Sequence, residues 1–469
     1  MSFVFYDTET TGLATHYDQI LQFAAIRTDA DLNETGRIEV RSRLMSHLVP
    51  HPAALRVTGM TIDQITDQNL PSHYEMVRQV RETLLGWSPA IFVGYNSLNF
   101  DEHLLRQALF QTLHPPYLTN TDGNCRADAM TLVQAASVFA PDCLKVPVIA
   151  GKQVFRLDQI AALNNFSHER AHDALADVEA TIHLAKCVRE HAPECWSRFA
   201  RFSKKATVAE FIQDEDGFVL TEFYFNKPYH YVVAAFGQDP EQDNVALCLN
   251  LNNDLNWLAS ASDQQLIAFA NKSPKPLRRV KSNSAPLIAS LDEMPDTVMG
   301  GLSVTEIARR ACRLKKDDAL KKRLTAAFVA SKKLSDTSLY IEDRLYDGFI
   351  SKEDEQRMAG FHDADWSNRA SIVEDLSDER LRYFGRRLIH ANHSHLLHRD
   401  HRVEIDNAVK ARLLAAAVPK DKWISLPMAL RATEDLIPSA VGPELELLTN
   451  YRTYLLGRYS RLNETIAAA

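Results

Sequence analysis

The chain has 469 residues, enough for roughly two to four domains of ordinary size. Hydrophobic residues make up 45% and charged residues 24%, the balance of a globular protein, and no apolar run reaches the length of a membrane span. The formal net charge of −8 does not favour a polyanion, so any nucleic-acid binding needs a local basic surface. The six scattered cysteines and the lack of a signal-peptide pattern predict a reduced, cytoplasmic protein with no membrane contact.

The first part of the chain alternates strand and helix patterns. Strands are expected near residues 3–7, 20–27, 38–44 and 91–96, and helices near 74–85, 102–112, 127–139, 157–163 and 173–190. This order predicts a mixed α/β sheet with helices on its faces. A His-Ala-Pro sequence ends the last helix, and we place a domain boundary near residue 195.

The remaining residues divide into a β-rich and a helical part. Residues 217–225, 229–236 and 245–251 are β-like runs separated by turn residues, which predicts a small antiparallel barrel or sandwich. Residues 304–332 look helical, and nearly everything from 345 onward is helix-patterned. The predicted domains are therefore 1–195, 196–340 and 341–469.

Two acids close the first strand. Asp7 and Glu9 stand two residues apart, so their side chains point to the same face of the strand. Carboxylates held that close repel each other, and a divalent cation with a preference for oxygen ligands, Mg²⁺ or Mn²⁺, relieves the conflict. Thr10 and Gly12 then turn the chain. Taken alone, this pattern is equally consistent with two surface acids at the end of a strand.

A third acid, Asp101, follows the apolar strand at 91–95 and precedes a helix. Junctions of this kind commonly carry sites in α/β sheets. Asn96 lies just before it and is suited to fix the turn through a hydrogen bond to the backbone. The simpler interpretation is that Asp101 only caps its helix.

The last candidates lie at the start of the helix 173–190. Asp177 is one turn into this helix and off its most apolar face, and His172 immediately precedes the helix. Asp173 is the better helix cap. By itself, His172 reads more simply as a helix-terminal histidine without a role.

Together these residues resemble the DEDDh exonucleases, which have an RNase H-like fold. The pattern is Asp7-x-Glu9, then Asn96-x-x-x-Phe100-Asp101, then His172-x-x-x-x-Asp177. Residues 22–29, 94–96 and 346–349 narrow the resemblance to bacterial exonuclease I, although it is loose between 250 and 340. The resemblance implies an exonuclease domain, a small SH3-like β domain and a helical C-terminal domain.

The resemblance also implies an activity: 3′→5′ degradation of single-stranded DNA to 5′-mononucleotides, in DNA repair. Two Mg²⁺ ions about 4 Å apart, which Mn²⁺ could replace, would clamp the scissile phosphodiester. The implied metal ligands are Asp7, Glu9, Asp101 and Asp177. His172 would accept the proton of the attacking water, which suits an imidazole pKa of about 6.5.

The resemblance also implies substrate-binding residues around this site and partners of the protein. Substrate-binding residues are expected to be Thr10, Gly12, Leu13, Asn96 and Lys227. The expected partners are single-stranded DNA and the C-terminal tail of single-stranded DNA-binding protein, and the protein is expected to be a monomer.

Two alternative functions stay open. One is a DEDDh exoribonuclease or proofreading exonuclease, which the length of the chain disfavours because such enzymes are usually shorter. The other is a nucleic-acid-binding scaffold with a dead nuclease fold, which the complete carboxylate set disfavours. Five histidines between 390 and 401 could bind a metal, but they lie far from the carboxylates in sequence and lack an accompanying cysteine.

Overall fold

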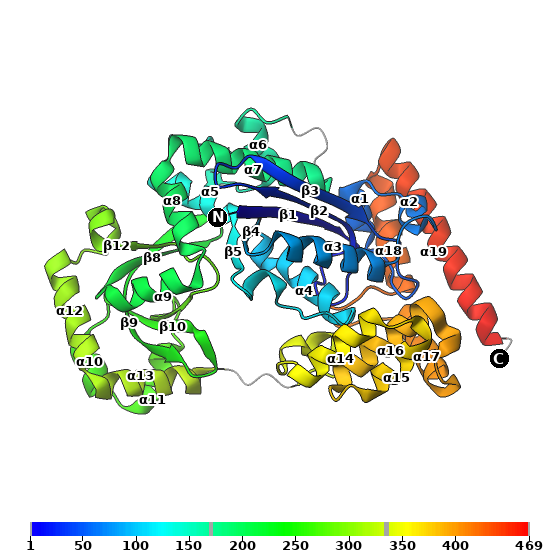
Figure 1. The fold of residues 1–469 in the computed structure, drawn as a ribbon. Helices are drawn as coiled ribbons and strands as arrows, with labels where there is room; N and C mark the ends of the chain where they lie inside the picture. Colours follow the sequence, from blue (N-terminus) through cyan, green and yellow to red (C-terminus); the bar gives the residue numbers. More distant parts are fainter. Residues whose placement is uncertain (1, 168–171, 333–336, 468–469) are drawn as a thin grey trace.

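The computed structural model describes residues 2–167, 172–332 and 337–467, and a five-stranded mixed sheet lies at its centre (Figure 1). The strand order is β3-β2-β1-β4-β5. The strands are β1 (Ser2–Thr10), β2 (Ile20–Thr28), β3 (Glu34–Arg41), β4 (Ala90–Gly94) and β5 (Cys125–Asp128). β2 is antiparallel to β1 and β3, whereas β4 runs parallel to β1 and β5. The predicted mixed α/β sheet is therefore confirmed.

Helices cover both faces of this sheet, so its central strands are buried on both sides. On β1, Phe3 and Phe5 pack into one core with α5 (Ala129–Phe139), α7 (Ala174–His191) and α8 (Pro193–Phe202). Val4 and Tyr6 point to the opposite face and pack with α3 (His73–Trp87) and α4 (Asp101–Gln111). The alternation along β1 thus decides which residues face α7.

Smaller elements complete this part of the chain. They are α1 (Pro52–Thr58), α2 (Ile62–Thr66), α6 (Leu157–Leu163) and the hairpin formed by β6 (Val148–Ile149) and β7 (Lys152–Gln153).

A second, antiparallel sheet follows, beside the first one in Figure 1, with the order β11-β10-β9-β8-β12. Its strands are β8 (Phe218–Tyr224), β9 (Lys227–Asp239), β10 (Gln242–Asn250), β11 (Leu277–Lys281) and β12 (Ile288–Ser290). The accompanying helices are α9 (Lys205–Asp214), α10 (Leu255–Ser260), α11 (Asp263–Ala270), α12 (Val304–Lys316) and α13 (Asp318–Ser331). The expected three β runs are present.

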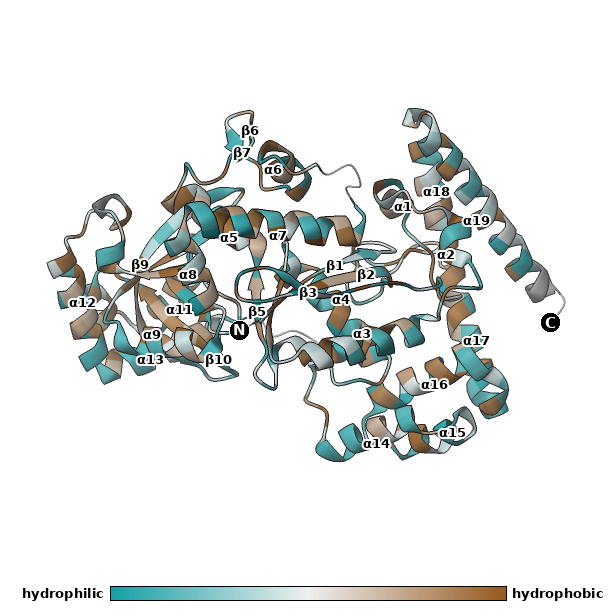
Figure 2. Cartoon of the chain, turned by 45° about the horizontal axis from the view of Figure 1, so that its top comes forward, coloured by the Kyte–Doolittle hydropathy of each residue, from teal (hydrophilic) through white to brown (hydrophobic). Residues whose placement is uncertain are grey.

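The rest of the described chain is helical. Its helices are α14 (Lys352–Asp363), α15 (Trp366–Asp375), α16 (Glu379–His393), α17 (Arg399–Leu414), α18 (Leu426–Leu436) and α19 (Pro443–Ala467). Figure 2 shows that hydrophobic and hydrophilic residues alternate along these helices. Their apolar faces pack on the first sheet and its helices: Phe384 contacts Phe110 with ring centroids 5.3 Å apart, and Tyr451 joins a core with Leu21.

Several elements differ from the sequence-based expectation. The helix expected from residue 127 begins only at Ala129, because residues 125–128 form strand β5, which pairs with β4. β11 forms in a stretch for which the sequence analysis expected no strand, since Leu277 to Lys281 pair with β10. β3 ends at Arg41 rather than near 44, because the backbone N–H groups of Arg43 and Leu44 bond to the carbonyls of Pro71 and Ile65 and not to β2.

The position of the first domain boundary stays a prediction. Helix α8 runs across residue 195, and its Trp196 and Phe199 pack in the same core as Phe3. The ring centroids of Trp196 and Phe3 are 5.1 Å apart. The first sheet therefore draws part of its core from residues beyond 195.

Two expectations from composition can be checked against the described residues. All six cysteines are free. No described helix combines the length and the apolarity that a membrane span needs.

Candidate active site

The end of β1 places two acids on the face that α7 covers. Asp7 and Glu9 lie opposite Ala24 and Gln22 of β2 in the antiparallel register. They follow Phe3 and Phe5 on the same face of the strand, since side chains alternate. A register shift after Glu9 ends the regular pairing, and Glu9 is only 8% exposed. Both carboxylates are therefore presented at the edge of a buried sheet.

The turn after β1 is fixed by an acid that the sequence analysis did not select. Asp18 accepts hydrogen bonds from Thr11 Oγ1 and from the backbone N–H of Ala14, both at 2.7 Å. A Cβ atom at Gly12 would lie 2.6 Å from Asp18 Oδ2, so any side chain there would displace the carboxylate that holds this turn. Thr10 Oγ1 donates to the Gly12 carbonyl, and the side chain of Leu13 is 85% exposed beyond the turn.

Helix α7 brings the next two candidates to the same place. Asp173 is its N-cap and accepts a hydrogen bond from Ala176 N at 3.3 Å, and Asp177 lies in the first turn. His172 precedes the cap with a φ of 65°, a left-handed conformation in which histidine is enriched but still uncommon. The predicted order of histidine, cap and acid is therefore present at the start of the helix.

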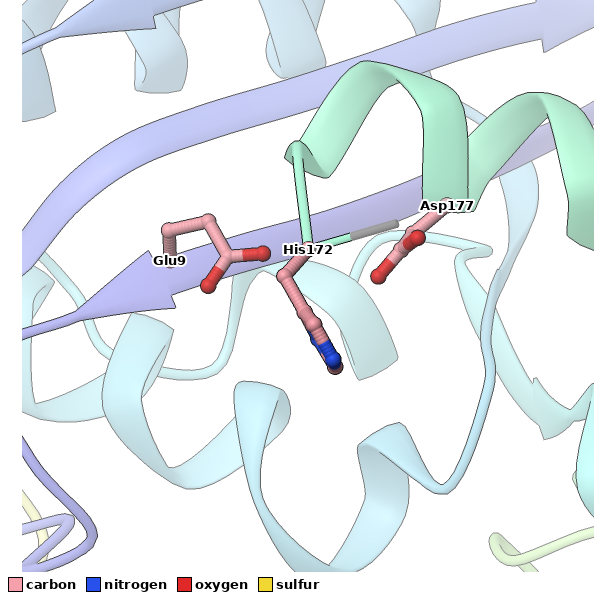
Figure 3. A group of neighbouring side chains, drawn as sticks. All are labelled: Glu9, His172 and Asp177. Carbon is pink, nitrogen blue, oxygen red and sulfur yellow. The ribbon is translucent and has the colours of Figure 1, made fainter. Parts of the chain in front are cut away.

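Glu9, His172 and Asp177 converge in space (Figure 3). Each offers one ligand atom, and these atoms all lie within 4.8 Å of one another. Within residues 2–167, 172–332 and 337–467, this is the one group of three or more His, Cys, Asp or Glu side chains close enough to hold a metal ion. The histidines at 390–401 do not form such a group; His390, for example, pairs with Asp406 at 2.9 Å.

Asp101 reaches the site from the other side of β1. It is the first residue of α4 and not its N-cap, which is Phe100. One oxygen, Oδ1, accepts hydrogen bonds from both Thr8 N at 3.1 Å and Thr8 Oγ1 at 2.5 Å. Thr8 lies between Asp7 and Glu9 on β1, so the strand that carries two acids also anchors the third.

Asn96 differs from its predicted role. We expected its side chain to hydrogen-bond the backbone, but its Oδ1 accepts from Asn99 Nδ2 at 3.0 Å. The carboxylate of Asp128 holds this turn instead, accepting from Asn96 N at 2.8 Å and from Leu98 N at 3.3 Å. Asp128 is the last residue of the short strand β5, which the sequence analysis did not predict. The backbone of Asn96 is left-handed, with a φ of 59°, which asparagine tolerates.

Lys227 lies apart from this cluster, at the first residue of β9 in the second sheet. The hairpin before it contains Phe225 and Asn226, both with positive φ, and Phe225 is 92% exposed. The hairpin strand β8 contacts the first domain through Phe223, whose ring centroid is 5.8 Å from that of Phe155. The structure therefore groups the predicted catalytic residues. Of the predicted substrate-binding residues, Thr10, Gly12, Leu13 and Asn96 lie at or beside the ends of first-sheet strands, and Lys227 lies on the second sheet.

Burial and mutual repulsion dominate the electrostatics of the acids. Burial, followed by the charges of Asp101 and Asp177, raises the pKa of Asp7 well above its usual value. The pKa of Glu9 rises to about 9, first through burial and then through Asp177 and Asp101. Burial likewise raises the pKa of Asp101 to about 7, against the opposing effect of the Thr8 hydrogen bonds.

This donor set fits a divalent metal ion. Buried carboxylates that resist ionisation need a positive charge to become fully ionised, and their oxygens are the ligands that Mg²⁺ and Mn²⁺ prefer. A histidine beside them adds a group able to accept a proton. Such an arrangement is suited to hydrolysis of a phosphodiester bond.

Comparisons with known proteins point to the same chemistry. A family model described as an exonuclease matches residues 4–185, which include all the residues of this cluster. Exodeoxyribonuclease I of Haemophilus influenzae is 27% identical over 417 residues, which cover 83% of this chain and 84% of that protein. The resemblance to bacterial exonuclease I is confirmed.

Solved structures extend the resemblance to the fold of the whole chain. Exonuclease I from Methylocaldum szegediense superposes with a TM-score of 0.83 at 25% identity, covering 97% of this chain and 99% of that one. A zinc-bound complex of Escherichia coli exonuclease I with single-stranded DNA gives a TM-score of 0.80 at 20% identity, covering 97% and 98% of the two chains. The chain therefore carries an RNase H-like exonuclease domain, and the protein is a nuclease of the hydrolase class.

The raised pKa of Glu9 predicts a pH dependence of stability in the metal-free protein. The Glu9 carboxyl has a pKa of about 9 in the fold and of about 4.3 in the unfolded chain. Its contribution to the stability of the fold is therefore fully present below about pH 4.3. That contribution is lost as the pH rises to the folded-state pKa of about 9. Relative to Glu9→Gln, the wild type should therefore become steadily less stable between about pH 5 and about pH 9.

Thermal unfolding with a chelator, measured at several pH values, tests this expectation. Glu179→Gln is the matched control, because Glu179 lies on α7 at the surface, with 35% of its side chain exposed. Parallel pH profiles for the wild type and Glu9→Gln would show that Glu9 ionises normally in the fold.

Proposed function

We propose that this protein is a 3′→5′ exodeoxyribonuclease that degrades single-stranded DNA to 5′-mononucleotides by metal-dependent hydrolysis. The observation that carries the proposal is the convergence of Glu9, Asp177 and His172 within 4.8 Å at the end of β1, beside the half-buried Asp7 and the buried Asp101. The match to exodeoxyribonuclease I over most of the chain supports DNA as the substrate.

In the proposed mechanism the acids hold the metal and the histidine moves a proton. Asp7, Glu9, Asp101 and Asp177 would hold two Mg²⁺ ions, with Mn²⁺ as a substitute. When bound, the ions would supply Lewis-acid stabilisation of the charge that develops on the phosphate. Asp101 is suited to this role because Thr8 occupies only its Oδ1.

His172 is proposed as the general base. It would accept a proton from the water that attacks the terminal phosphodiester, as the new P–O bond forms and the bond to the 3′-oxygen of the preceding nucleotide breaks. The half-exposed position of His172, outside the regular turns of α7, gives its ring access to water. The released product is a 5′-mononucleotide.

The predicted substrate-binding residues keep their roles as part of the proposal. The exposed Leu13 side chain and the tight turn of Thr10 and Gly12 are suited to contact the terminal nucleotide. Asn96 would contribute from the turn before Asp101. Lys227, next to the exposed Phe225, would contact the strand farther from the 3′ end, where aromatic rings can stack on bases.

The same proposal covers the second sheet and the C-terminal helices. We propose that they form an SH3-like domain and a helical domain, divided near 195 and 340, that grip single-stranded DNA and exclude duplex. Lys281 on β11 is the basic residue that best supports a local positive potential, since it lies near Arg279 and Arg126. Arg279 and Arg126 themselves pair with Asp239 and Glu102, and Arg309 and Arg310 both pair with Glu306, so these four arginines contribute less.

We further propose that the enzyme acts as a cytoplasmic monomer in DNA repair. It would also bind the C-terminal tail of single-stranded DNA-binding protein.

Degradation of labelled oligonucleotides tests the activity directly. With Mg²⁺, the wild type should release 5′-mononucleotides from the 3′ end of single-stranded DNA, and Asp7→Ala should abolish release while the protein stays folded. Faster degradation of an RNA oligonucleotide of the same sequence would favour the exoribonuclease instead. Near-normal turnover by folded Asp7→Ala would exclude the assigned metal site.

Replacement of His172 tests the general base. His172→Ala should lower the rate of the chemical step by about 10²–10⁴-fold while DNA affinity stays near that of the wild type. Single-turnover kinetics separate the two quantities. The wild-type rate should rise with pH through the titration of an imidazole, and an unchanged pH profile in His172→Ala would assign the proton transfer to another group.

Binding of strands of increasing length tests the proposed DNA grip. Affinity of the inactive Asp7→Ala protein should increase beyond the few nucleotides that the first domain can cover, and should fall as salt rises. Fluorescence titrations at two salt concentrations measure both effects. An affinity that is already maximal for a trinucleotide, or that is indifferent to salt, would contradict the grip.

A further inference from the structure

A closed ring of four polar side chains joins the first sheet to the start of α7. Its members are Gln22 on β2, Glu39 and Arg41 on β3, and Asp173 at the N-cap of α7, and we call it the N-cap ring. Gln22 Nε2 donates to Glu39 Oε1 at 2.9 Å and to Asp173 Oδ2 at 3.1 Å. Arg41 Nη2 closes the ring, 3.4 Å from Asp173 Oδ2 and 3.8 Å from Glu39 Oε1.

Gln22 is the buried centre of the N-cap ring. It is fully buried, and it lies directly opposite both Glu9 and Arg41 in the strand registers. Its two neighbours are carboxylates that can only accept, so the amide nitrogen must face them and both of its protons are used. Its Oε1 has no hydrogen-bond partner among the described residues. Gln22 therefore serves here as a pure donor, a role that a carboxylate of the same shape cannot fill.

The ring acts on the residue that adjoins His172. Buried Ala174, Leu175 and Val178 hold the body of α7 against the sheet through apolar packing. His172 precedes the helix, does not share that packing, and has a left-handed backbone. The position of Asp173 thus sets where the chain leaves the helix and where the imidazole lies relative to Glu9.

We infer that Gln22 and Arg41 are positioning residues, which fix His172 in its reactive place by holding Asp173. The inference rests on the proposed function, because it assigns a purpose to the orientation of the proposed general base. The alternative is that the N-cap ring only stabilises α7, as an ordinary capping network would.

Two arginines on β3 provide a matched pair for the test. Arg41 and Arg37 lie on the same face of the strand, are similarly exposed at 41% and 45%, and both pair with α7. Arg41 contacts the N-cap, whereas Arg37 contacts Glu179 at 3.2 Å, farther along the helix. Arg41→Gln should lower the single-turnover rate on single-stranded DNA, and Arg37→Gln should leave it within about twofold of the wild type.

Gln22→Glu is the stronger perturbation, since it places a third acid between Glu39 and Asp173. Misplacement of a catalytic group by about 1 Å can cost about 10²-fold, so we expect a rate loss of about 10–100-fold with an unchanged KM. Adding Asp173→Asn should recover part of the rate, because it exchanges the positions of amide and carboxylate and keeps a good N-cap residue.

The decisive measurement combines each change with His172→Ala. If the ring acts through His172, Gln22→Glu and Arg41→Gln should cause no further loss in the His172→Ala protein. Losses that add in full would overturn the inference, since a structural role does not depend on His172. So would full activity of both variants in the wild-type background. Should Gln22→Glu fail to fold, the comparison of Arg41→Gln with Arg37→Gln decides alone.

Failure of this inference can be distinguished from failure of the proposed function. A wild-type protein that does not degrade single-stranded DNA would overturn the proposed function and the inference with it. An active wild type with an impaired His172→Ala, but with Arg41→Gln as active as Arg37→Gln, would overturn only the inference.

Discussion

Repulsion between buried carboxylates at the end of β1 is the constraint on which the rest of the site depends. Glu9 and Asp101 are buried and Asp7 is half-buried, so water solvates their charges poorly, and the charge of Asp101 raises the pKa of both Asp7 and Glu9. An arrangement of this kind costs stability unless a cation neutralises it. Its presence in the otherwise ordinary core of an α/β domain is the physical argument for a metal-dependent enzyme.

The fold holds these groups together through a few specific contacts. Apolar packing of Phe3 and Phe5 against α7 sets the strand beside the helix. The Thr8 hydrogen bonds then draw Asp101 to the strand, and Asp173 caps the helix that carries Asp177. The acids come from three separate elements, so their convergence is a property of the tertiary structure and not of any single segment.

The sequence predicted the parts of this arrangement that depend on the period of a strand or helix and on the spacing of residues. The same-face placement of Asp7 and Glu9 follows from the period of a strand, and the position of Asp177 one turn into α7 follows from the helical pattern. The mixed sheet follows from the order of apolar runs. Resemblance to a known family supplied the connection between these segments.

The remainder depends on contacts that no local pattern encodes. Strand β5 has only four residues, so Asp128 was not seen as the acid that holds the Asn96 turn. The role of Gln22 requires the register of three strands and the location of the α7 N-cap. The contact between Asp18 and Gly12 depends on the folded shape of the turn, which the sequence does not show.

The number of protons released when the metal binds tests the central claim most directly. Carboxyls with raised pKa values bind protons in the metal-free protein, and a cation must displace those protons to occupy the site. Calorimetric titration with Mg²⁺ or Mn²⁺ near neutral pH, repeated in buffers of different ionisation enthalpy, counts them. The account predicts release of about one proton or more per protein, reduced in Glu9→Gln. Metal binding without proton release, or with the same release in Glu9→Gln, would contradict it.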